Sequence, residues 1–397
     1  MTAERGMELC GRRADTGQPV RVEVHAGRIT RVQSAAPAEA ADWPWIAPGL
    51  IDIQVNGYGG QEFASAGLTV PRAAEVIRSF ARFGLSRLCP TLTTESFEVL
   101  RHACATLAAL CDSDAELARR VPGLHLEGPY ITPEDGARGA HPRAHCRPPD
   151  WNEFQRLQDA SGGRIRIVTL SPEYEGSLDF IRRATQSGVT VAIGHMSATA
   201  EQVRAAVEAG ARLSTHLGNG SHPYLHRFRN YLWVQLAEDR LNASLIVDGH
   251  HLPPEVVRVF VRCKTPERCI LVSDLSGQAG QPPGRYSSRF CDVEILADGS
   301  LVVAGQRELM AGASLPLNHS VGNAMAFAGV DLATAMRMAT DHPAALLGIE
   351  PGGIAPGKPA DLIQFRLTPP EAPGKAPRME ILRTVWDGCV VWEKEGR

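Results

Sequence analysis

The feature that most constrains the fold is a set of short apolar runs, each ending in a residue that can bind a metal ion. The run in VPGLHLEGPY ends at Glu127, that in VTVAIGHM at His195, that in ARLSTHLGNG at His216 and that in CILVSDLSG at Asp274. Apolar runs of this length bounded by Gly or Pro are typical of strands buried on both faces, as in parallel sheets covered by helices. Because the carboxyl ends of parallel strands meet at one face, we expect these four side chains to lie together.

Each of these residues has a simpler interpretation when it is taken alone. An isolated His at a strand end is more often a hydrogen-bonded core or surface residue than a ligand, and Glu127 or Asp274 could cap a helix. Residues that can bind a metal recur at the ends of four apolar runs separated by helix-sized intervals, and this recurrence favours a shared site. One Glu, two His and one Asp suffice for a zinc-like hydrolytic site with an open position and a general base.

The alternation of apolar runs with helical patterns predicts an α/β fold, a (β/α)8 TIM barrel. The eight strands are expected within residues 45–60, 85–94, 121–130, 165–173, 189–196, 211–220, 242–251 and 269–277. Helices are expected within residues 73–83, 99–110, 178–188, 199–210, 253–263, 318–327 and 332–347.

The two chain ends predict a second, smaller domain. Residues 19–33 alternate apolar and polar positions across an Ala-Gly turn, which indicates a β-hairpin, and residues 357–367 and 383–394 read as short strands. Strands at both termini need partners, so we expect a small β-sandwich made from residues 1–47 and 349–397. The barrel then occupies residues 48–348, with a β-hairpin insertion near 288–306 that turns at Asp298-Gly299.

Composition excludes several classes of protein. The 397 residues are 44% hydrophobic and 21% charged, as in soluble globular proteins, and the net charge of -3 argues against a nucleic-acid surface. The nine cysteines form no CxxC pair and follow no secretory signal, so we expect reduced thiols in a cytoplasmic protein. No apolar run approaches about 18 residues, so no membrane span is expected.

Several motifs in a fixed order resemble a known family. PGLIDIQVNG, HLEGPY followed by GAHP, AIGHMSATAEQV, STHLGN, DGHHL, LVSD and GKPADLI are together similar to the amidohydrolase superfamily and, within it, to the N-acetylglucosamine-6-phosphate deacetylases. The resemblance implies that Glu127, His195 and His216 bind one divalent metal. It also implies that Asp274 is the general acid/base and that His141 orients and polarises the acetyl carbonyl.

The expected number of metal ions depends on the end of the first barrel strand, where this sequence differs from many amidohydrolases. Many amidohydrolases carry a His-X-His pair there and use two metals, whereas this chain has Gln54 and Asn56, which are poor ligands for a second transition metal. We therefore expect one divalent metal, zinc, although iron, cobalt and manganese also suit the ligands. Such an ion would lower the pKa of its water from about 15.7 towards about 7, and the resulting hydroxide would attack the amide.

The resemblance also implies how the substrate is bound. The family positions that contact the sugar or its phosphate correspond to Asn219, Gly220, Arg227 and His251, in some members across the subunits of a homodimer. Here the sequence departs from the family, because Phe228-Arg229-Asn230 follows Arg227 where relatives have Glu-Pro-Gly. A solvated surface position is the alternative interpretation of Arg227.

The leading hypothesis is a cytoplasmic, homodimeric hydrolase that deacetylates N-acetylglucosamine 6-phosphate in amino-sugar catabolism. An amidohydrolase for another N-acylated amino sugar or a cyclic amide is the second hypothesis, motivated by the altered loop. The third is a non-catalytic sugar-binding relative, against which the retained Asp274 argues. The expected partner is thus a small amino sugar, with no nucleic acid and no membrane.

Overall fold

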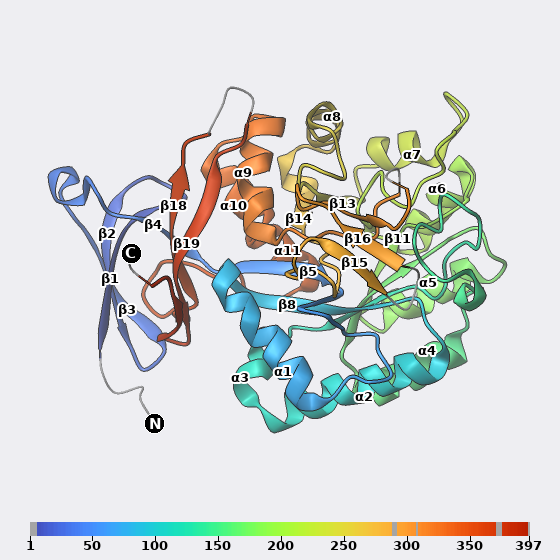
Figure 1. The fold of residues 1–397 in the computed structure, drawn as a ribbon, viewed down its shortest axis with the longest axis horizontal. Helices are drawn as coiled ribbons and strands as arrows, with labels where there is room; N and C mark the ends of the chain where they lie inside the picture. Colours follow the sequence, from blue (N-terminus) through green and yellow to red (C-terminus); the bar gives the residue numbers. More distant parts are fainter. Residues whose placement is uncertain (1–5, 288–291, 307–308, 371–374, 396–397) are drawn as a thin grey trace.

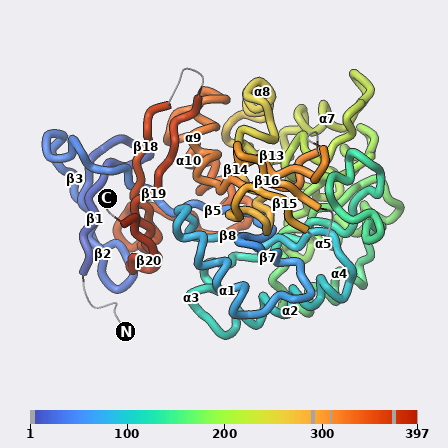
Figure 2. The backbone as a smooth tube through the Cα atoms, viewed as in Figure 1, coloured from blue at the N-terminus to red at the C-terminus, as the bar shows by residue number. Residues whose placement is uncertain are grey.

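The computed structural model describes residues 6–287, 292–306, 309–370 and 375–395. Figure 1 shows two parts side by side, a barrel flanked by helices and a β-sheet that contains strands from both ends of the chain. The backbone trace in Figure 2 shows that the first and the last strands of the described chain both belong to this sheet.

Eight parallel strands form the barrel, in the sheet order β14-β13-β12-β11-β10-β9-β8-β5. They are β5 (Leu50–Val55), β8 (Leu85–Thr93), β9 (Leu124–Glu127), β10 (Ile165–Leu170), β11 (Thr190–Ile193), β12 (Leu213–Ser214), β13 (Asn242–Ile246) and β14 (Cys269–Val272). The ring closes between the last residues of β5 and the residues just beyond β14, where Val55 pairs with Leu275 and the Asp274 N–H donates to the Gln54 carbonyl at 3.0 Å. The predicted (β/α)8 barrel is confirmed.

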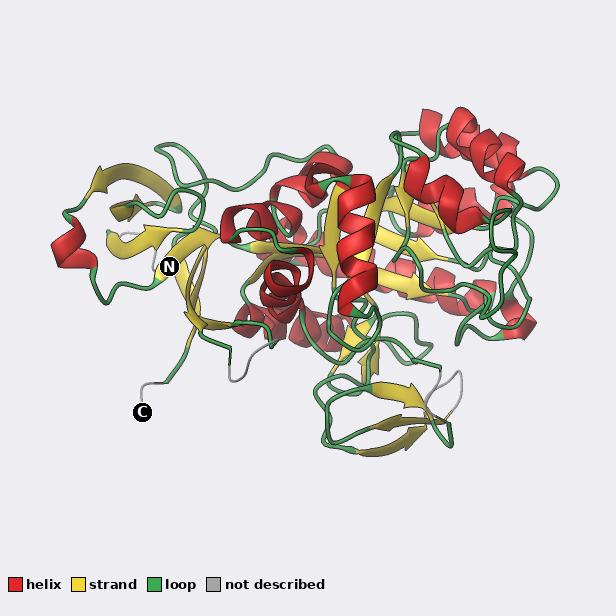
Figure 3. Ribbon diagram, turned by 90° about the horizontal axis from the view of Figure 1, so that it is seen from above, coloured by secondary structure: helices red, strands yellow, loops and turns green. Residues whose placement is uncertain are grey.

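Helices cover the outer face of the barrel (Figure 3). They are α1 (Val70–Ser79), α2 (Phe97–Ser113), α3 (Ala115–Arg120), α4 (Trp151–Ala160), α5 (Ser177–Gln186), α6 (Ala200–Ala209), α7 (Tyr231–Ala237), α8 (Pro254–Lys264), α9 (Leu317–Ala328), α10 (Leu332–Met338) and α11 (Asp341–Leu347). The strands are apolar on both faces because one face packs on these helices and the other fills the barrel, where Ile51, Ile167 and Ile246 are buried. Among the described residues, no helix combines the length and apolar composition that a bilayer crossing requires.

Two elements differ from the expectation. The strand expected over residues 45–60 divides at Gly49 into β4 (Trp45–Pro48), which joins the terminal sheet, and β5. Gly49 is needed at this crossing, because a Cβ there would lie 2.5 Å from Ser86 Cβ. The helix expected over 332–347 is broken into α10 and α11, since Pro343 lacks an N–H and its ring would clash with a carbonyl one turn earlier.

The terminal sheet has seven strands in the order β20-β19-β18-β4-β1-β2-β3. Besides β4 they are β1 (Met7–Arg13), β2 (Pro19–His25), β3 (Arg28–Ser34), β18 (Leu362–Thr368), β19 (Arg378–Trp386) and β20 (Cys389–Glu393). The expected hairpin is β2–β3, whose turn has positive φ at Ala26 (48°) and Gly27 (77°), as a type I′ turn requires. The sheet curls over a core that includes Val22, Leu362 and Val385. The predicted β-sandwich from both chain ends is confirmed as a β-domain built from both termini, with its strands in one continuous curled sheet. The boundaries at residues 47 and 349 stay a prediction.

A small antiparallel sheet interrupts the chain after the last barrel strand. It consists of β15 (Gly284–Ser287), β16 (Asp292–Ile295) and β17 (Leu301–Val303). The turn at Asp298-Gly299 connects β16 to β17, while residues 288–291 of the predicted insertion lie outside the described residues. The remaining short elements are β6 (Gly57–Tyr58), β7 (Gln61–Glu62) and the 3-10 turns η1 (Pro37–Ala40), η2 (Phe80–Phe83), η3 (Arg143–His145) and η4 (Pro266–Arg268).

Candidate active site

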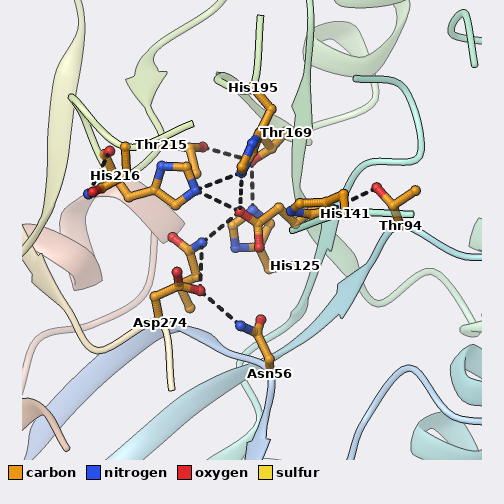
Figure 4. A network of polar contacts seen from close by, with 12 residues as sticks. Asn56, Thr94, His125, His141, Thr169, His195, Thr215, His216 and Asp274 are labelled. Atoms are coloured by element: carbon orange, nitrogen blue, oxygen red, sulfur yellow. Dashed lines mark hydrogen bonds and ion pairs between the residues drawn. The ribbon is translucent and has the colours of Figure 1, made fainter. Parts of the chain in front are cut away.

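The four residues at the ends of the apolar runs line one cavity at the carboxyl end of the barrel, and Figure 4 shows three of them, His195, His216 and Asp274, pointing toward a common centre. Glu127 is the last residue of β9, and His195, His216 and Asp274 each lie two residues beyond β11, β12 and β14. These last three have left-handed backbones, with φ of 47°, 30° and 52°. A non-glycine residue in this conformation typically costs about 1–3 kcal/mol, and such strain is concentrated at functional sites.

Three donor atoms form a tight triangle. Glu127 Oε1 lies 2.9 Å from His216 Nε2 and 3.4 Å from His195 Nε2, and the two Nε2 atoms are 3.0 Å apart. Ligand atoms on a tetrahedral zinc ion with bonds of about 2.0–2.2 Å are separated by roughly 3.3 Å, so the triangle fits a divalent cation. The His195 Nδ1–H donates to the Ala137 carbonyl at 2.9 Å, which leaves the Nε2 lone pair facing the other two atoms.

The charges of the triangle also favour a cation. Burial acts to raise the pKa of Glu127, but its hydrogen bonds with His195 and His216 hold that pKa well below the usual range. Burial acts to lower the pKa of His216, but the contact with the Glu127 carboxylate leaves that pKa raised. The space between the three atoms therefore stabilises positive charge, which a divalent cation would supply.

His141 belongs to a second, wider set of possible ligands. Glu127, His141 and His195 each offer one donor atom, and these atoms lie within 4.8 Å of one another. We favour His216 over His141 as the third ligand, because its Nε2 is at 2.9 and 3.0 Å from the other two donor atoms. Among the described residues the buried His216 Nδ1 has no hydrogen-bond partner, so the ring is held by its Nε2 contacts and by packing.

Side-chain amides occupy the place where a second metal would need imidazoles. Gln54 Nε2 donates to Glu127 Oε1 at 2.9 Å and to Asp274 Oδ1 at 3.2 Å, and Asn56 Nδ2 donates to the same Asp274 oxygen at 2.9 Å. N–H donors cannot bind a cation, and here they hold the two carboxylates. Because Oδ1 accepts both amide hydrogens, Oδ2 is the oxygen of Asp274 left to accept a further proton.

Asp274 has the proton affinity of a general base that works near neutral pH. Burial, followed by the neighbouring negative charge of Glu127, raises the pKa of Asp274 to about 7. A bound cation would lower this pKa again, because it favours the carboxylate.

A cavity of about 270 Å³ surrounds these groups. Its lining includes the predicted His141, Asn219, Gly220 and His251, and it does not include Arg227. His251 Nδ1 lies 2.8 Å from Asp248 Oδ2, which fixes its ring. Only glycine fits at position 220, because at its φ of 58° a Cβ would lie 2.6 Å from His195 Nδ1. The sequence alone did not indicate this constraint.

Several lining residues were not expected from the sequence. Glu62 adds a third carboxylate and accepts the Gly277 N–H at 2.9 Å, and Val293 and Met310 add an apolar wall. The position of Glu62 in the glycine-rich loop after the first barrel strand was an available signal. Within the described residues, no Lys or Arg lines this cavity, so a phosphate group on a substrate would need a cation from elsewhere.

Arg227 lies on an exposed loop beside an aromatic patch. The patch consists of Tyr224, Phe228 and Trp233, whose exposed fractions are 92%, 78% and 52%. The Arg227 carbonyl accepts the Trp233 indole N–H at 2.8 Å, so this loop has a defined conformation with its aromatic rings facing solvent. Large exposed aromatic groups of this kind mark interaction surfaces.

Comparison with known proteins connects this geometry to a family. The sequence profile of the Amidohydrolase family matches residues 45–391. The chain is 34% identical over 324 residues to N-acetylgalactosamine-6-phosphate deacetylase of Escherichia coli O157:H7, covering 80% of this chain and 82% of that protein. It is 35% identical over 314 residues to N-acetylglucosamine-6-phosphate deacetylase of Homo sapiens, covering 77% of this chain and 75% of that one.

A solved structure is similar over nearly the whole chain. It is the N-acetyl-D-glucosamine-6-phosphate deacetylase of Mycobacterium smegmatis, determined as a mutant in complex with N-acetyl-D-glucosamine-6-phosphate. The two chains superpose with a TM-score of 0.84 at 29% identity, covering 97% of this chain and 99% of the other.

Proposed function

Because this chain belongs to the amidohydrolase family, we propose that it is a hydrolase that removes the acetyl group from N-acetylglucosamine 6-phosphate. The observation that carries the proposal is the triangle of Glu127, His195 and His216 with Asp274 beside it in one cavity. Relatives that share about a third of the sequence are deacetylases of hexosamine phosphates, which supports the substrate class.

The chain's own residues would move the protons. Glu127, His195 and His216 would hold a divalent cation, which would supply the positive charge that acidifies a water molecule and polarises an amide carbonyl. Asp274 accepts the proton of the attacking water at Oδ2, and His141 donates a hydrogen bond to the developing oxyanion. Asp274 then returns the proton to the amine nitrogen, which is too basic to leave as an anion.

We propose one metal ion per chain, zinc being the first candidate, because amide N–H groups of Gln54 and Asn56 fill the second position. Two imidazoles and a carboxylate also suit iron, cobalt and manganese. Elemental analysis of the purified protein tests the stoichiometry and the identity of the metal together.

We propose that the protein is a homodimer in which Arg227 reaches the cavity of the partner. The support is that Arg227 is exposed, that the cavity of its own chain lacks a cationic side chain among the described residues, and that an aromatic patch adjoins it. Co-expression of Arg227→Ala with Asp274→Asn tests this arrangement. If Arg227 acts across the interface, each dimer that contains one chain of each variant has one intact site and one inactive site. Random pairing makes about half of the dimers mixed, so about a quarter of all sites are active. If it acts within its own chain, no site is intact.

The N-acetylgalactosamine 6-phosphate deacetylase activity is a second candidate, favoured by the similarity to the Escherichia coli O157:H7 enzyme. A panel of both N-acetylhexosamine 6-phosphates and both free sugars, assayed by acetate release, separates the candidates. A clear preference for the two phosphates supports the proposed class. Equal rates on free and phosphorylated sugars would favour an amidohydrolase for other N-acylated amino sugars.

The division into residues 1–47 with 349–397 and residues 48–348 remains our proposal for the domains. A cytoplasmic location also remains a proposal, and the eight described cysteines, all free thiols, suit a reducing compartment.

A further inference from the structure

The cavity histidines differ in the group that faces Nδ1, and this group sets which ring nitrogen carries the proton. His195 Nδ1 faces the carbonyl oxygen of Ala137, and His251 Nδ1 faces the carboxylate of Asp248. Both partners only accept hydrogen bonds, so both rings must carry a proton on Nδ1. A neutral ring of this kind has a bare Nε2, which suits a metal ligand but cannot donate a hydrogen bond.

His141 has a different partner. Its Nδ1 lies 2.8 Å from Thr94 Oγ1, and a hydroxyl can donate as well as accept (Figure 4). If the Thr94 O–H donates to Nδ1, the ring proton of neutral His141 lies on Nε2, the nitrogen on the side away from Thr94. That tautomer is the one that can donate to a carbonyl oxygen in the cavity.

The contacts of Thr94 favour donation, because among the described residues its buried hydroxyl has no hydrogen-bond partner other than His141 Nδ1. Thr94 follows the last residue of β8 and is fully buried. Its Oγ1 lies against Gly128, just beyond β9, so closely that a Cβ at Gly128 would overlap it. Only glycine leaves this space, and Gly128 has the positive φ of 79° that glycine permits.

We propose that Thr94 is a positioning residue, which donates its hydroxyl hydrogen to His141 Nδ1 and so makes neutral His141 a hydrogen-bond donor towards the substrate. The inference rests on the proposed deacetylase function for its consequence in catalysis. The tautomer itself is a property of the free enzyme and can be measured without a substrate.

The first test is NMR of the imidazole nitrogens in the zinc-loaded protein carrying nitrogen-labelled histidine. The signal that disappears in His141→Gln is assigned to His141. We expect a protonated Nε2 and a bare, hydrogen-bonded Nδ1 in the wild type, and a change in the chemical shift of the bare Nδ1 in Thr94→Val, because valine cannot donate the hydrogen bond. A protonated Nδ1 in the wild-type protein would overturn the proposal, whatever the enzyme acts on.

The second test is kinetic. Thr94→Val should lower kcat roughly 10- to 100-fold with zinc content unchanged, as loss of a group that orients a functional histidine typically does. Thr94→Ser keeps the donor and should restore most of the activity. An unchanged kcat in Thr94→Val, or a Thr94→Ser variant as impaired as Thr94→Val, contradicts the role.

Thr91→Val is the matched control. Thr91 lies in β8, three residues before Thr94, and is equally buried, but its hydroxyl bonds backbone groups, the Cys89 carbonyl at 3.1 Å and the Val55 N–H at 2.9 Å. This change should leave the His141 tautomer as in the wild type. The same change of the His141 Nδ1 signal in Thr94→Val and Thr91→Val would mean that any loss of a hydroxyl near the end of β8 disturbs the ring, and the proposal would fall.

Discussion

Arg120 joins the barrel to the terminal sheet, and replacing it with Met should destabilise the whole protein. Arg120 ends α3, and its side chain is 1% exposed. Nη1 lies 2.8 Å from Asp361 Oδ1, Nη2 lies 2.7 Å from Asp387 Oδ2, and the guanidinium stacks 5.1 Å from the Trp386 ring centroid. Arg120→Met keeps most of the apolar side chain but leaves the buried Asp361 carboxylate without its charge partner.

The burial of Asp361 and Asp387 determines how much stability the Arg120→Met variant loses. Removing one member of a buried ion pair typically costs about 3–5 kcal/mol, because the other charge remains in a poorly solvated place. Asp387 is partly exposed and can recover water, so the loss comes mainly from Asp361. We therefore expect the free energy of unfolding to fall by about 3–5 kcal/mol.

Arg119 provides a matched control one residue earlier. It contacts the same oxygen, Asp387 Oδ2, at the same 2.7 Å, but its side chain is 55% exposed. Exposed ion pairs contribute about 0–1 kcal/mol, so Arg119→Met should shift stability by no more than that. Adding Asp361→Asn to Arg120→Met removes the unpaired charge and should restore part of the loss.

Urea unfolding followed by circular dichroism and by tryptophan fluorescence provides the measurement, since agreement of the two signals tests for a single transition. Similar small losses for Arg119→Met and Arg120→Met would refute the reasoning, because burial would then not govern the value of the contact. A further loss on adding Asp361→Asn would refute it as well.

Three further predictions concern the cavity and the strand below it. Asp274→Asn should retain metal, since Asp274 is not one of the proposed ligands. It should lower kcat by about 10²- to 10⁴-fold, because an amide cannot take a proton. Steady-state kinetics and metal analysis on the same sample measure both effects. Gly220→Ala should weaken zinc binding about 10- to 100-fold, because the added methyl group would push the His195 ring. Gly163→Ala is the control, since Gly163 also has a positive φ, of 77°, but has open space around it. In a chelator titration its zinc affinity should equal that of the wild type. Burial raises the pKa of Asp52 to about 7, so the folded state holds a proton that the unfolded chain releases near pH 4. The contribution of Asp52 to stability is then greatest below pH 4 and declines as pH rises from about 4 to about 7, and urea midpoints across that range should vary less in Asp52→Asn.

The barrel could be predicted from the sequence because its strands leave a strong local signal. The strands are mostly apolar and buried, and the residues with metal-binding chemistry lie at the end of four of them or two residues beyond it. The first part of this pattern follows from burial on both faces, and the second follows from the meeting of the strand ends. The sequence pattern therefore predicts that Glu127, His195, His216 and Asp274 lie together.

Other features have no such signal because they depend on contacts between distant segments. The carbonyl of Ala137 that orients His195 is a backbone group, which any residue could supply. Thr94 reads as an ordinary strand residue until its hydroxyl is seen beside His141. The exposed position of Arg227 depends on the path of an irregular loop, which neither hydrophobic periodicity nor the order of motifs specifies.

The sheet made from both chain ends has a consequence for synthesis on the ribosome. Strand β4 pairs with β1 along one edge and with β18 along the other. The paired residues Ala47 of β4 and Ile363 of β18 are separated by about 300 residues, most of them in the barrel. At about 5–20 residues per second, β4 emerges roughly 15–60 s before its partner exists. During that interval the hairpin β2–β3 and strand β1 can form, but one edge of β4 has open N–H and C=O groups. A nascent chain therefore presents an unpaired strand edge throughout synthesis of its barrel, which makes this edge a natural place for a chaperone to bind or for two incomplete chains to associate.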